Sequence, residues 1–202
     1  MERAGIPEMD AKKLLEILSV AEKLKCSTRH CYTSNGRRES VAEHSWRTAL
    51  MAMLLSGEKD FAAVDMNRVI RMCLIHDLGE AFTGDIPAFQ KTEADSVTEK
   101  QLLEQWLGGF CEAQKLEFQS LFTEMEAQET KEAKLYKALD KLEALIQHNE
   151  SDLSTWLPLE YELQYTYGTE QMKISPYLQK LRAEIDAWTT EKIHAGVPKQ
   201  QR

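Results

Sequence analysis

Apolar residues recur at helical spacing along most of the chain, and this periodicity limits the fold more than any other feature. In residues 9–25, Leu14, Leu18 and Ala21 share one face, as they do in an amphipathic helix. The same pattern predicts helices over about residues 40–55, 65–82, 95–108, 114–129, 130–149, 158–167 and 175–193. No segment has a convincing strand pattern, and the chain has only nine glycines and five prolines. The sequence therefore predicts an all-α fold of six to eight helices.

Two segments receive more specific predictions. Ser40 and Glu43 are spaced as a capping box, so a helix should begin there and run to about Leu55. Residues 27–38 lack clear periodicity and contain the turn signal Ser34-Asn35-Gly36, so we expect a loop.

The charge composition of the chain limits the kinds of molecule that it can bind. The chain carries 25 basic and 33 acidic residues, a formal net charge of −8. A surface with this excess of negative charge repels phosphate backbones, so no nucleic-acid partner is expected.

The longest apolar run, Ala49 to Leu55, falls far short of the roughly 20 residues of a membrane-spanning helix. The N-terminus lacks the apolar core of a secretion signal, and the four cysteines form no C-x-x-C pair. We expect a cytoplasmic protein with reduced thiols and no membrane partner.

Four polar residues interrupt otherwise apolar helical faces. His76 and Asp77 are adjacent within an apolar segment, and burying both is costly unless each has a partner. His44 lies in the first turn of its predicted helix, and Asp140 neighbours the apolar face that includes Leu139. Taken singly, the histidines could be core or capping residues, and Asp140 could pair with a lysine such as Lys137 or Lys141. Taken together, two imidazoles and two carboxylates form a mixed set suited to one divalent ion.

Such a set leaves coordination positions for water and substrate, as a catalytic site requires. A metal there would lower the pKa of a bound water and provide a nucleophile near neutral pH. The residues themselves therefore predict a hydrolytic metal centre. His148, at the end of the helix that carries Asp140, is interpreted as a cation at a helix C-terminus, with no role in function.

The order His44, His76-Asp77, Asp140 resembles the H…HD…D signature of the HD-domain metal-dependent phosphohydrolases. Residues 38–45, RESVAEHS, and residues 76–87, HDLGEAFTGDIP, resemble the matching segments of the 5′-deoxynucleotidase branch of that family. The resemblance extends from about Leu14 to Gln147. That range is the expected metal-site core, about 14–147. The length of the chain and its helical pattern predict one domain over residues 1–193, with C-terminal helices of about 158–193 and a tail of 194–202.

The resemblance also implies roles for individual residues. His44, His76, Asp77 and Asp140 would bind one divalent ion, which could be Mn, Co, Mg, Zn, Ni or Fe. Glu80 and Asp85 would be catalytic. The substrate would be bound by Arg29, which would hold its phosphate, by His30, which stands where the family has a tryptophan, and by Asp85, Ile86, Pro87 and Ala88. The spacing of Glu80 from His76, one helical turn, independently predicts that both point to one side.

These implications lead to a functional hypothesis with alternatives. The first is a 5′-nucleotidase that hydrolyses (deoxy)nucleoside 5′-monophosphates to nucleoside and phosphate. The second is an HD phosphohydrolase for another phosphate ester, such as a cyclic nucleotide or a nucleoside triphosphate. The third is a nucleotide-binding protein without turnover. A small helical domain with several large apolar residues also allows a homodimer.

Overall fold

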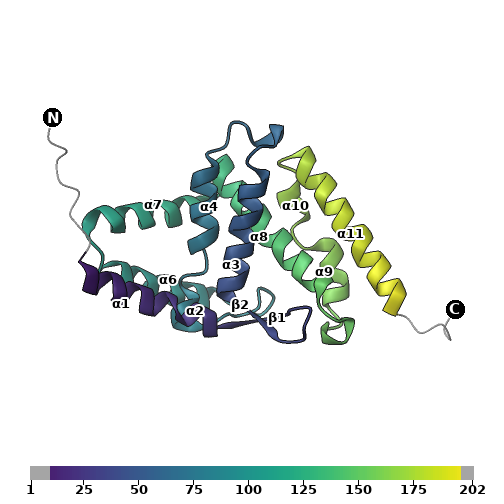
Figure 1. Ribbon diagram of the computed structural model, residues 1–202, viewed down its shortest axis with the longest axis horizontal. Coiled ribbons are helices and arrows are strands. Elements are labelled where there is room, and N and C mark those ends of the chain that lie inside the picture. Colours follow the sequence, from purple (N-terminus) through teal and green to yellow (C-terminus); the bar gives the residue numbers. More distant parts are fainter. Residues whose placement is uncertain (1–9, 197–202) are drawn as a thin grey trace.

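The computed structural model describes residues 10–196. Figure 1 shows their arrangement. In chain order the elements are α1 (Ala11–Ala21), α2 (Lys23–Cys26), β1 (Thr28–Tyr32), β2 (Arg38–Ser40), α3 (Val41–Leu55), η1 (Lys59–Phe61), α4 (Met66–Ile75), α5 (Glu80–Thr83), α6 (Glu93–Leu107), α7 (Glu112–Ala127), α8 (Lys131–Glu150), η2 (Leu153–Thr155), α9 (Glu160–Thr166), α10 (Thr169–Met172) and α11 (Pro176–Gly196).

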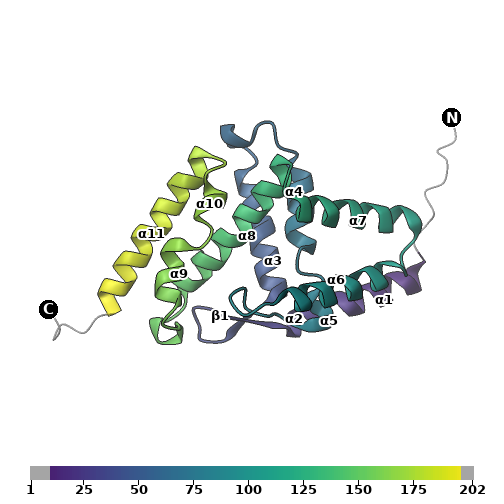
Figure 2. The ribbon, with the colours of Figure 1, turned by 180° about the vertical axis from the view of Figure 1, so that it is seen from behind.

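Helix α8 lies at the centre of the molecule, with α3, α4, α7, α10 and α11 packed around it (Figures 1 and 2). Leu135, Leu139 and Leu142 of α8 are completely or almost completely buried in the larger of two apolar clusters. Burial of a leucine side chain stabilises a fold by about 1.5–3 kcal/mol. The helix that carries Asp140 is therefore fixed on several sides by its own neighbours.

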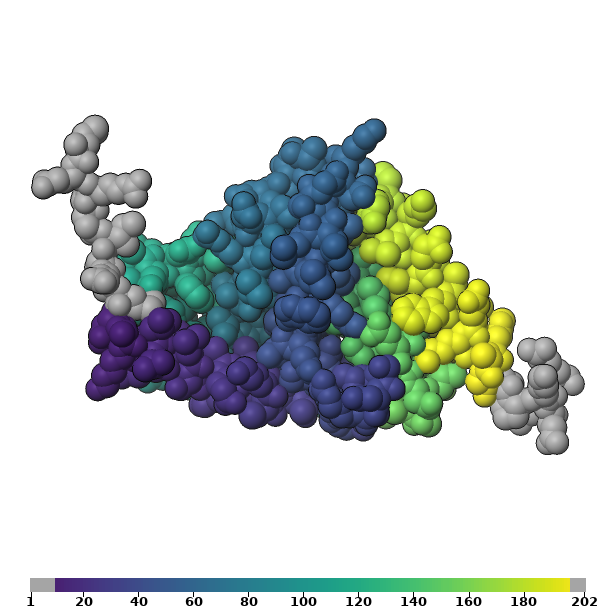
Figure 3. Space-filling model, in the orientation of Figure 1, coloured from purple at the N-terminus to yellow at the C-terminus, as the bar shows by residue number. Residues whose placement is uncertain are grey.

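A smaller apolar cluster joins α2, α5 and α6 to the first turn of α3 through Leu24, Val41, Ala81 and Leu107. Helix α1 lies along the lower edge of the face shown in Figure 3, and α11 forms the flank at the opposite end. Helix α3 begins with the predicted capping box: Ser40 Oγ accepts from the Glu43 amide at 3.3 Å, and Glu43 Oε2 accepts from the Ser40 amide at 2.9 Å. This cap fixes the helix end from which His44 projects.

The all-α prediction is confirmed, with local corrections. Among residues 10–196, eight α-helices have seven residues or more, and α2, α5 and α10 are single turns. The first predicted helix is divided at Glu22, and its residue 9 lies outside the described range. Helix α11 continues to Gly196, so residues 194–196 of the predicted tail are helical and the remainder lies outside the described range. Within the described range no helix has both the length and the hydropathy to cross a bilayer.

The predicted loop over residues 27–38 is wrong, because β1 and β2 form an antiparallel hairpin there. The burial of β1 does alternate, with Arg29 and Cys31 facing inward. An inward-facing arginine hides this alternation in the sequence, where strands are identified by inward-facing apolar residues.

The predicted helix over 65–82 is also interrupted, because α4 ends at Ile75 and α5 begins at Glu80. His76 and Asp77 therefore lie in the turn between two helices. Gly84, which follows α5, has a φ of 77°, a backbone conformation that glycine adopts without steric cost. This turn directs Asp85 and the residues after it along the pocket described below.

Candidate metal centre and adjoining pocket

Four polar atoms from α3, α8 and the α4–α5 turn converge on one point. His44 Nε2 lies 3.1 Å from Asp140 Oδ1, 3.3 Å from His76 Nε2 and 3.9 Å from Asp77 Oδ2. His76 Nε2 lies 3.1 Å from Asp77 Oδ2 and 3.7 Å from Asp140 Oδ1. The structure thus brings together all four residues that the sequence predicted as metal ligands.

The tautomers of the two histidines fit a cation at this point. His76 Nδ1 donates to the carbonyl oxygen of Cys73 at 2.8 Å, and His44 Nδ1 donates to a carboxylate oxygen of Glu143. Each Nδ1 therefore carries its proton, so each Nε2 can present a lone pair to a cation. The two Nε2 atoms lie 3.3 Å apart. Burial and Arg29 lower the pKa of His44, but Glu143 and Asp140 outweigh them and raise it to about 10, so the surroundings favour a positive charge at this point. The donor set therefore fits a divalent metal ion.

Glu143 supports the centre from inside the protein. Its side chain is fully buried, and its second oxygen accepts from Arg47 Nε at 2.6 Å. Burial raises the pKa of Glu143, but His44, Arg29 and Arg47 outweigh this and hold it at about 2. The carboxylate is therefore ionised, and it strengthens the imidazole of His44 as a ligand.

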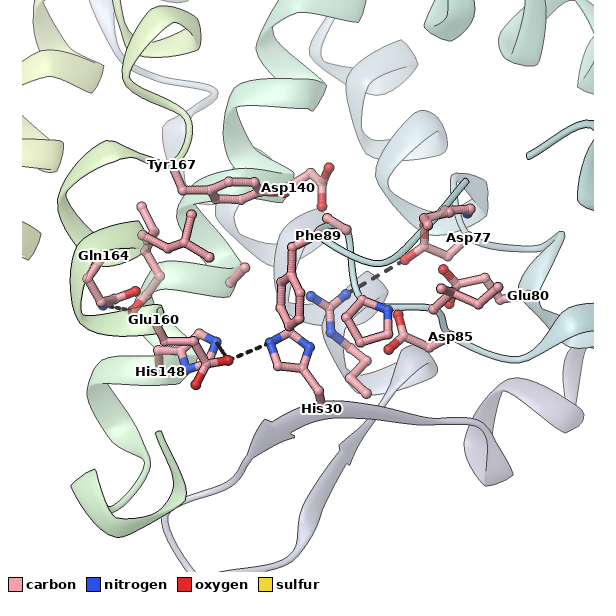
Figure 4. Close-up of a pocket in the computed structure, with 18 of the residues that line it drawn as sticks. His30, Asp77, Glu80, Asp85, Phe89, Asp140, His148, Glu160, Gln164 and Tyr167 are labelled. Carbon is pink, nitrogen blue, oxygen red and sulfur yellow. Dashed lines mark hydrogen bonds and ion pairs between the residues drawn. The ribbon is translucent and has the colours of Figure 1, made fainter. Parts of the chain in front are cut away.

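A pocket opens beside the centre (Figure 4), with a volume of about 920 Å³ when the space at its mouth is included. Asp77 and Asp140 form one end of it, and the turn after α5 forms part of its wall. The predicted residues that line it are Arg29, His30, Asp77, Glu80, Asp85, Ile86, Pro87, Ala88 and Asp140. Its lining combines apolar side chains with a few charged groups, which suits a small organic ligand that carries charge.

Arg29 places a buried positive charge beside the centre. Its Nε lies 3.2 Å from Glu39 Oε2, and its Nη1 lies 3.8 Å from Asp77 Oδ2. Burial alone would lower the pKa of the guanidinium, but the negative groups around it raise it further above the ordinary arginine value. The cation is thus permanent, and a guanidinium can bind a phosphate through two parallel hydrogen bonds.

Glu80 and Asp85 lie on the same side of the pocket. Glu80 is 6% exposed, and its Oε2 has no hydrogen-bond partner among the described residues. Burial, followed by the negative charges of Asp77 and Asp85, raises the pKa of Glu80 to about 10. Burial also raises the pKa of Asp85. Burial thus favours the protonated form of Glu80, which can donate a proton.

The far end of the pocket contains residues to which the sequence gave no function. His148, Glu160, Gln164 and Tyr167 line it, and Lys137 lines the wall near the centre, with its Nζ 2.8 Å from Asp140 Oδ2. The interpretation of His148 as a charged helix-end residue is wrong. Its side chain is buried, and burial lowers its pKa to about 4, so it is neutral. The sequence does contain a signal that could have placed His148 in the pocket. His148 lies eight residues after Asp140, a spacing at which two side chains lie on nearby faces of one helix.

His30 turns toward this far end. Its Nε2 lies 3.0 Å from Glu160 Oε1, and its ring stands edge-on to Phe89 with 5.5 Å between centroids (Figure 4). Glu160 lies beyond Gln147, where the sequence resemblance ends. The sequence therefore does not predict that Glu160 contacts His30.

Comparison with known proteins gives a consistent result. A family model described as an HD domain matches residues 21–182. The 5′-deoxynucleotidase HDDC2 of Homo sapiens is 30% identical over 194 residues, which cover 92% of this chain and 91% of the relative. The HDDC2 of Xenopus laevis is 33% identical over 151 residues, 73% of each chain.

Solved structures point to the same family as the sequence comparisons. A crystal structure described as a predicted metal-dependent phosphohydrolase from Magnetospirillum magnetotacticum MS-1 is 30% identical to this chain. It matches with a TM-score of 0.79, over 96% of this chain and 98% of that one. The family model spans well over half of the sequence, and its matched range includes every residue of the metal centre. The chain therefore belongs to the HD domain family.

Proposed function

We propose that this protein is a metal-dependent phosphohydrolase that cleaves (deoxy)nucleoside 5′-monophosphates to nucleoside and inorganic phosphate. The observation that carries the proposal is the direct opening of the His/Asp centre into a pocket that holds a buried arginine at its inner end. Relatives named 5′-deoxynucleotidases, similar to this chain over most of its length, support the same substrate class.

His44, His76, Asp77 and Asp140 would hold the divalent ion. Such an ion provides a Lewis acid and activates water for attack on phosphorus near neutral pH. Two imidazole nitrogens among four donors favour Mn, Co, Zn, Ni or Fe, since Mg prefers oxygen ligands. The geometry also supports binding of the ion, because ligand atoms of His44, His76 and Asp77 lie within 4.8 Å of one another and Asp140 Oδ1 lies 3.1 Å from His44 Nε2.

The remaining residues would bind and orient the substrate. Arg29 would hold the phosphate and offset the negative charge that grows on it during the reaction. Glu80, whose burial favours the protonated carboxyl group, would give its proton to the departing sugar oxygen. Asp85, Ile86, Pro87 and Ala88 would contact the nucleoside, with His30 on the wall beside them.

We further propose that residues 1–193 act as one domain, because the core and the C-terminal helices both line the pocket. The four cysteines are free, which fits a reducing compartment such as the cytoplasm. The acidic net charge favours a small nucleotide over a nucleic acid or an anionic membrane as partner. Pairing of two copies remains our expectation for a helical domain of this kind.

The decisive experiment measures phosphate release by the purified protein with Mn²⁺, Co²⁺ or Zn²⁺. The substrate panel contains deoxynucleoside and nucleoside 5′-monophosphates, a cyclic nucleotide and a nucleoside triphosphate. Asp77→Asn should abolish release, whereas Asp152→Asn, at an exposed position, should not reduce it. Turnover of the cyclic or triphosphate substrates alone would overturn the substrate assignment. Equal activity of Asp77→Asn and the wild type would overturn the proposal that this centre catalyses the hydrolysis.

A further inference from the structure

A second group of metal-binding side chains lies at the far end of the pocket. It consists of His30 and Cys31 of β1, His148 of α8 and Glu160 of α9, here called the far-end cluster. Cys31 Sγ lies 3.3 Å from His148 Nε2 and 3.9 Å from His30 Nε2. Glu160 Oε1 lies 3.0 Å from His30 Nε2 and 3.6 Å from His148 Nε2. Ligand atoms of His30, Cys31 and His148 all lie within 4.8 Å of one another.

These separations are those expected around one ion. Zinc binds nitrogen and oxygen at about 2.0–2.1 Å and sulfur at about 2.3 Å, so neighbouring ligands of a tetrahedral ion are roughly 3.3–3.6 Å apart. The four measured distances, 3.0 to 3.9 Å, fall around that range. Two imidazoles, one thiolate and one carboxylate would also neutralise a double positive charge.

The far-end cluster is buried, and burying polar ligand atoms without partners costs folding free energy. Cys31 is 1% exposed and Glu160 is 3% exposed. Glu160 Oε1 is buried and has no partner of hydrogen-bonding geometry among the described residues, although His30 Nε2 is only 3.0 Å away. The two buried ligand atoms are therefore close enough together to bind one cation.

The cluster is also held in place by its surroundings. The second oxygen of Glu160 accepts from the Leu157 amide at 2.6 Å. The ring of His148 packs edge-on against Trp156 with 5.8 Å between centroids. Cys31 is fixed by the backbone of the β1–β2 hairpin. Three separate elements, β1, α8 and α9, therefore present their ligand atoms in fixed positions, as a metal site requires.

We propose that His30, Cys31, His148 and Glu160 bind a second divalent cation, with zinc preferred because the set includes sulfur. Cys31 binds as the thiolate and releases its proton to solvent. His30, Cys31 and His148 provide three ligands within 4.8 Å of one another, and Glu160 provides the fourth beside the two histidines. Four protein ligands would complete a tetrahedral shell, so this ion is structural and ties β1, α8 and α9 together at the end of the pocket. The proposal stands independently of the proposed phosphohydrolase activity.

The sulfur ligand gives a specific test, because the donors at the first centre are only nitrogen and oxygen. The full chain, stripped of metal and titrated with Co²⁺, should develop a thiolate-to-cobalt charge-transfer band in the near ultraviolet. Cys31→Ser should remove this band. Cys26→Ser, which removes an exposed thiol, and Asp77→Asn, which alters the first centre, should retain it.

Zinc content measured by elemental analysis gives a second readout. The wild type should bind about two zinc ions per chain, and Cys31→Ser and Glu160→Gln about one each. Circular dichroism checks that each variant is folded. If wild-type protein binds cobalt without a charge-transfer band, the proposal is overturned even if the Cys31→Ser variant does not fold. A band that persists in Cys31→Ser overturns it equally.

Discussion

His44 donates from Nδ1 to a carboxylate oxygen of Glu143, and neither side chain has any exposure to solvent. This contact orients the imidazole so that its Nε2 faces His76, Asp77 and Asp140. Glu143 is itself held by Arg47. One carboxylate that cannot reach the pocket therefore determines how a predicted metal ligand is presented.

Glu143→Gln should weaken metal binding by about 10–100-fold, because an outer-shell partner orients a ligand and raises its basicity. The amide keeps the shape of the side chain but removes its charge. Titration calorimetry with Mn²⁺ or Zn²⁺ measures the effect. Glu150→Gln is the matched control, since Glu150 also pairs with Arg47 but is partly exposed. Equal affinities of the two variants would contradict the role given to Glu143.

Arg29→Lys should lower kcat/KM for nucleoside monophosphates by about 10²-fold, the usual loss on removing one donor that stabilises transition-state charge. Lysine keeps a positive charge beside the buried Glu39 but cannot form two parallel hydrogen bonds to phosphate. Steady-state kinetics are the measurement, with Arg71→Lys, at an exposed position on α4, as control. Unchanged kinetics for Arg29→Lys would remove Arg29 from the phosphate site.

Leu139→Ala should lower the free energy of unfolding by about 2–5 kcal/mol, the cost of deleting a fully buried leucine side chain and leaving a cavity. Leu139 is completely buried directly before Asp140, whereas Leu54 is 73% exposed. Leu54→Ala should therefore change stability little. Urea denaturation of both variants checks the expectation, and equal losses would show that α8 is not the core helix.

The start of α11 should confer a pH dependence on stability. Asp60 Oδ2 accepts from Ser175 Oγ at 2.6 Å and from the Tyr177 amide at 2.9 Å. These bonds lower the pKa of Asp60 below its ordinary value of 3.8. The native state then binds fewer protons than the unfolded state near that pH. The resulting stability is present above pH 3.8 and is lost as pH falls through the lowered pKa.

Thermal unfolding of wild type and Asp60→Asn across pH 3–7 measures this contribution. The wild type should be the more stable at neutral pH, and the difference should shrink as the pH falls below about 4. Glu58→Gln, two residues away, controls for a general change in charge. A difference that is constant with pH would show that the carboxylate charge does not matter at this position.

The sequence predicted the helical fold because apolar periodicity is a local signal. It predicted the convergence of His44, His76, Asp77 and Asp140 because these residues interrupt apolar helical faces and their order resembles a family signature. It missed the β1–β2 hairpin because Arg29, one of the two inward-facing residues of β1, lacks the apolar character of a core strand residue. The meeting of Cys31 with His148, 117 positions apart, depends on tertiary packing, and no local pattern encodes it. The roles assigned to Arg29, Glu80 and Asp85 stay predictions.

Helix α8 contributes Asp140 and Glu143 to one cluster and His148 to the other. Each residue of an α-helix advances the direction of its side chain by about 100°. Inserting or deleting a single residue between Asp140 and His148 would therefore swing one set of ligands out of alignment with the other. A chain that keeps both clusters must therefore keep the number of residues between Asp140 and His148.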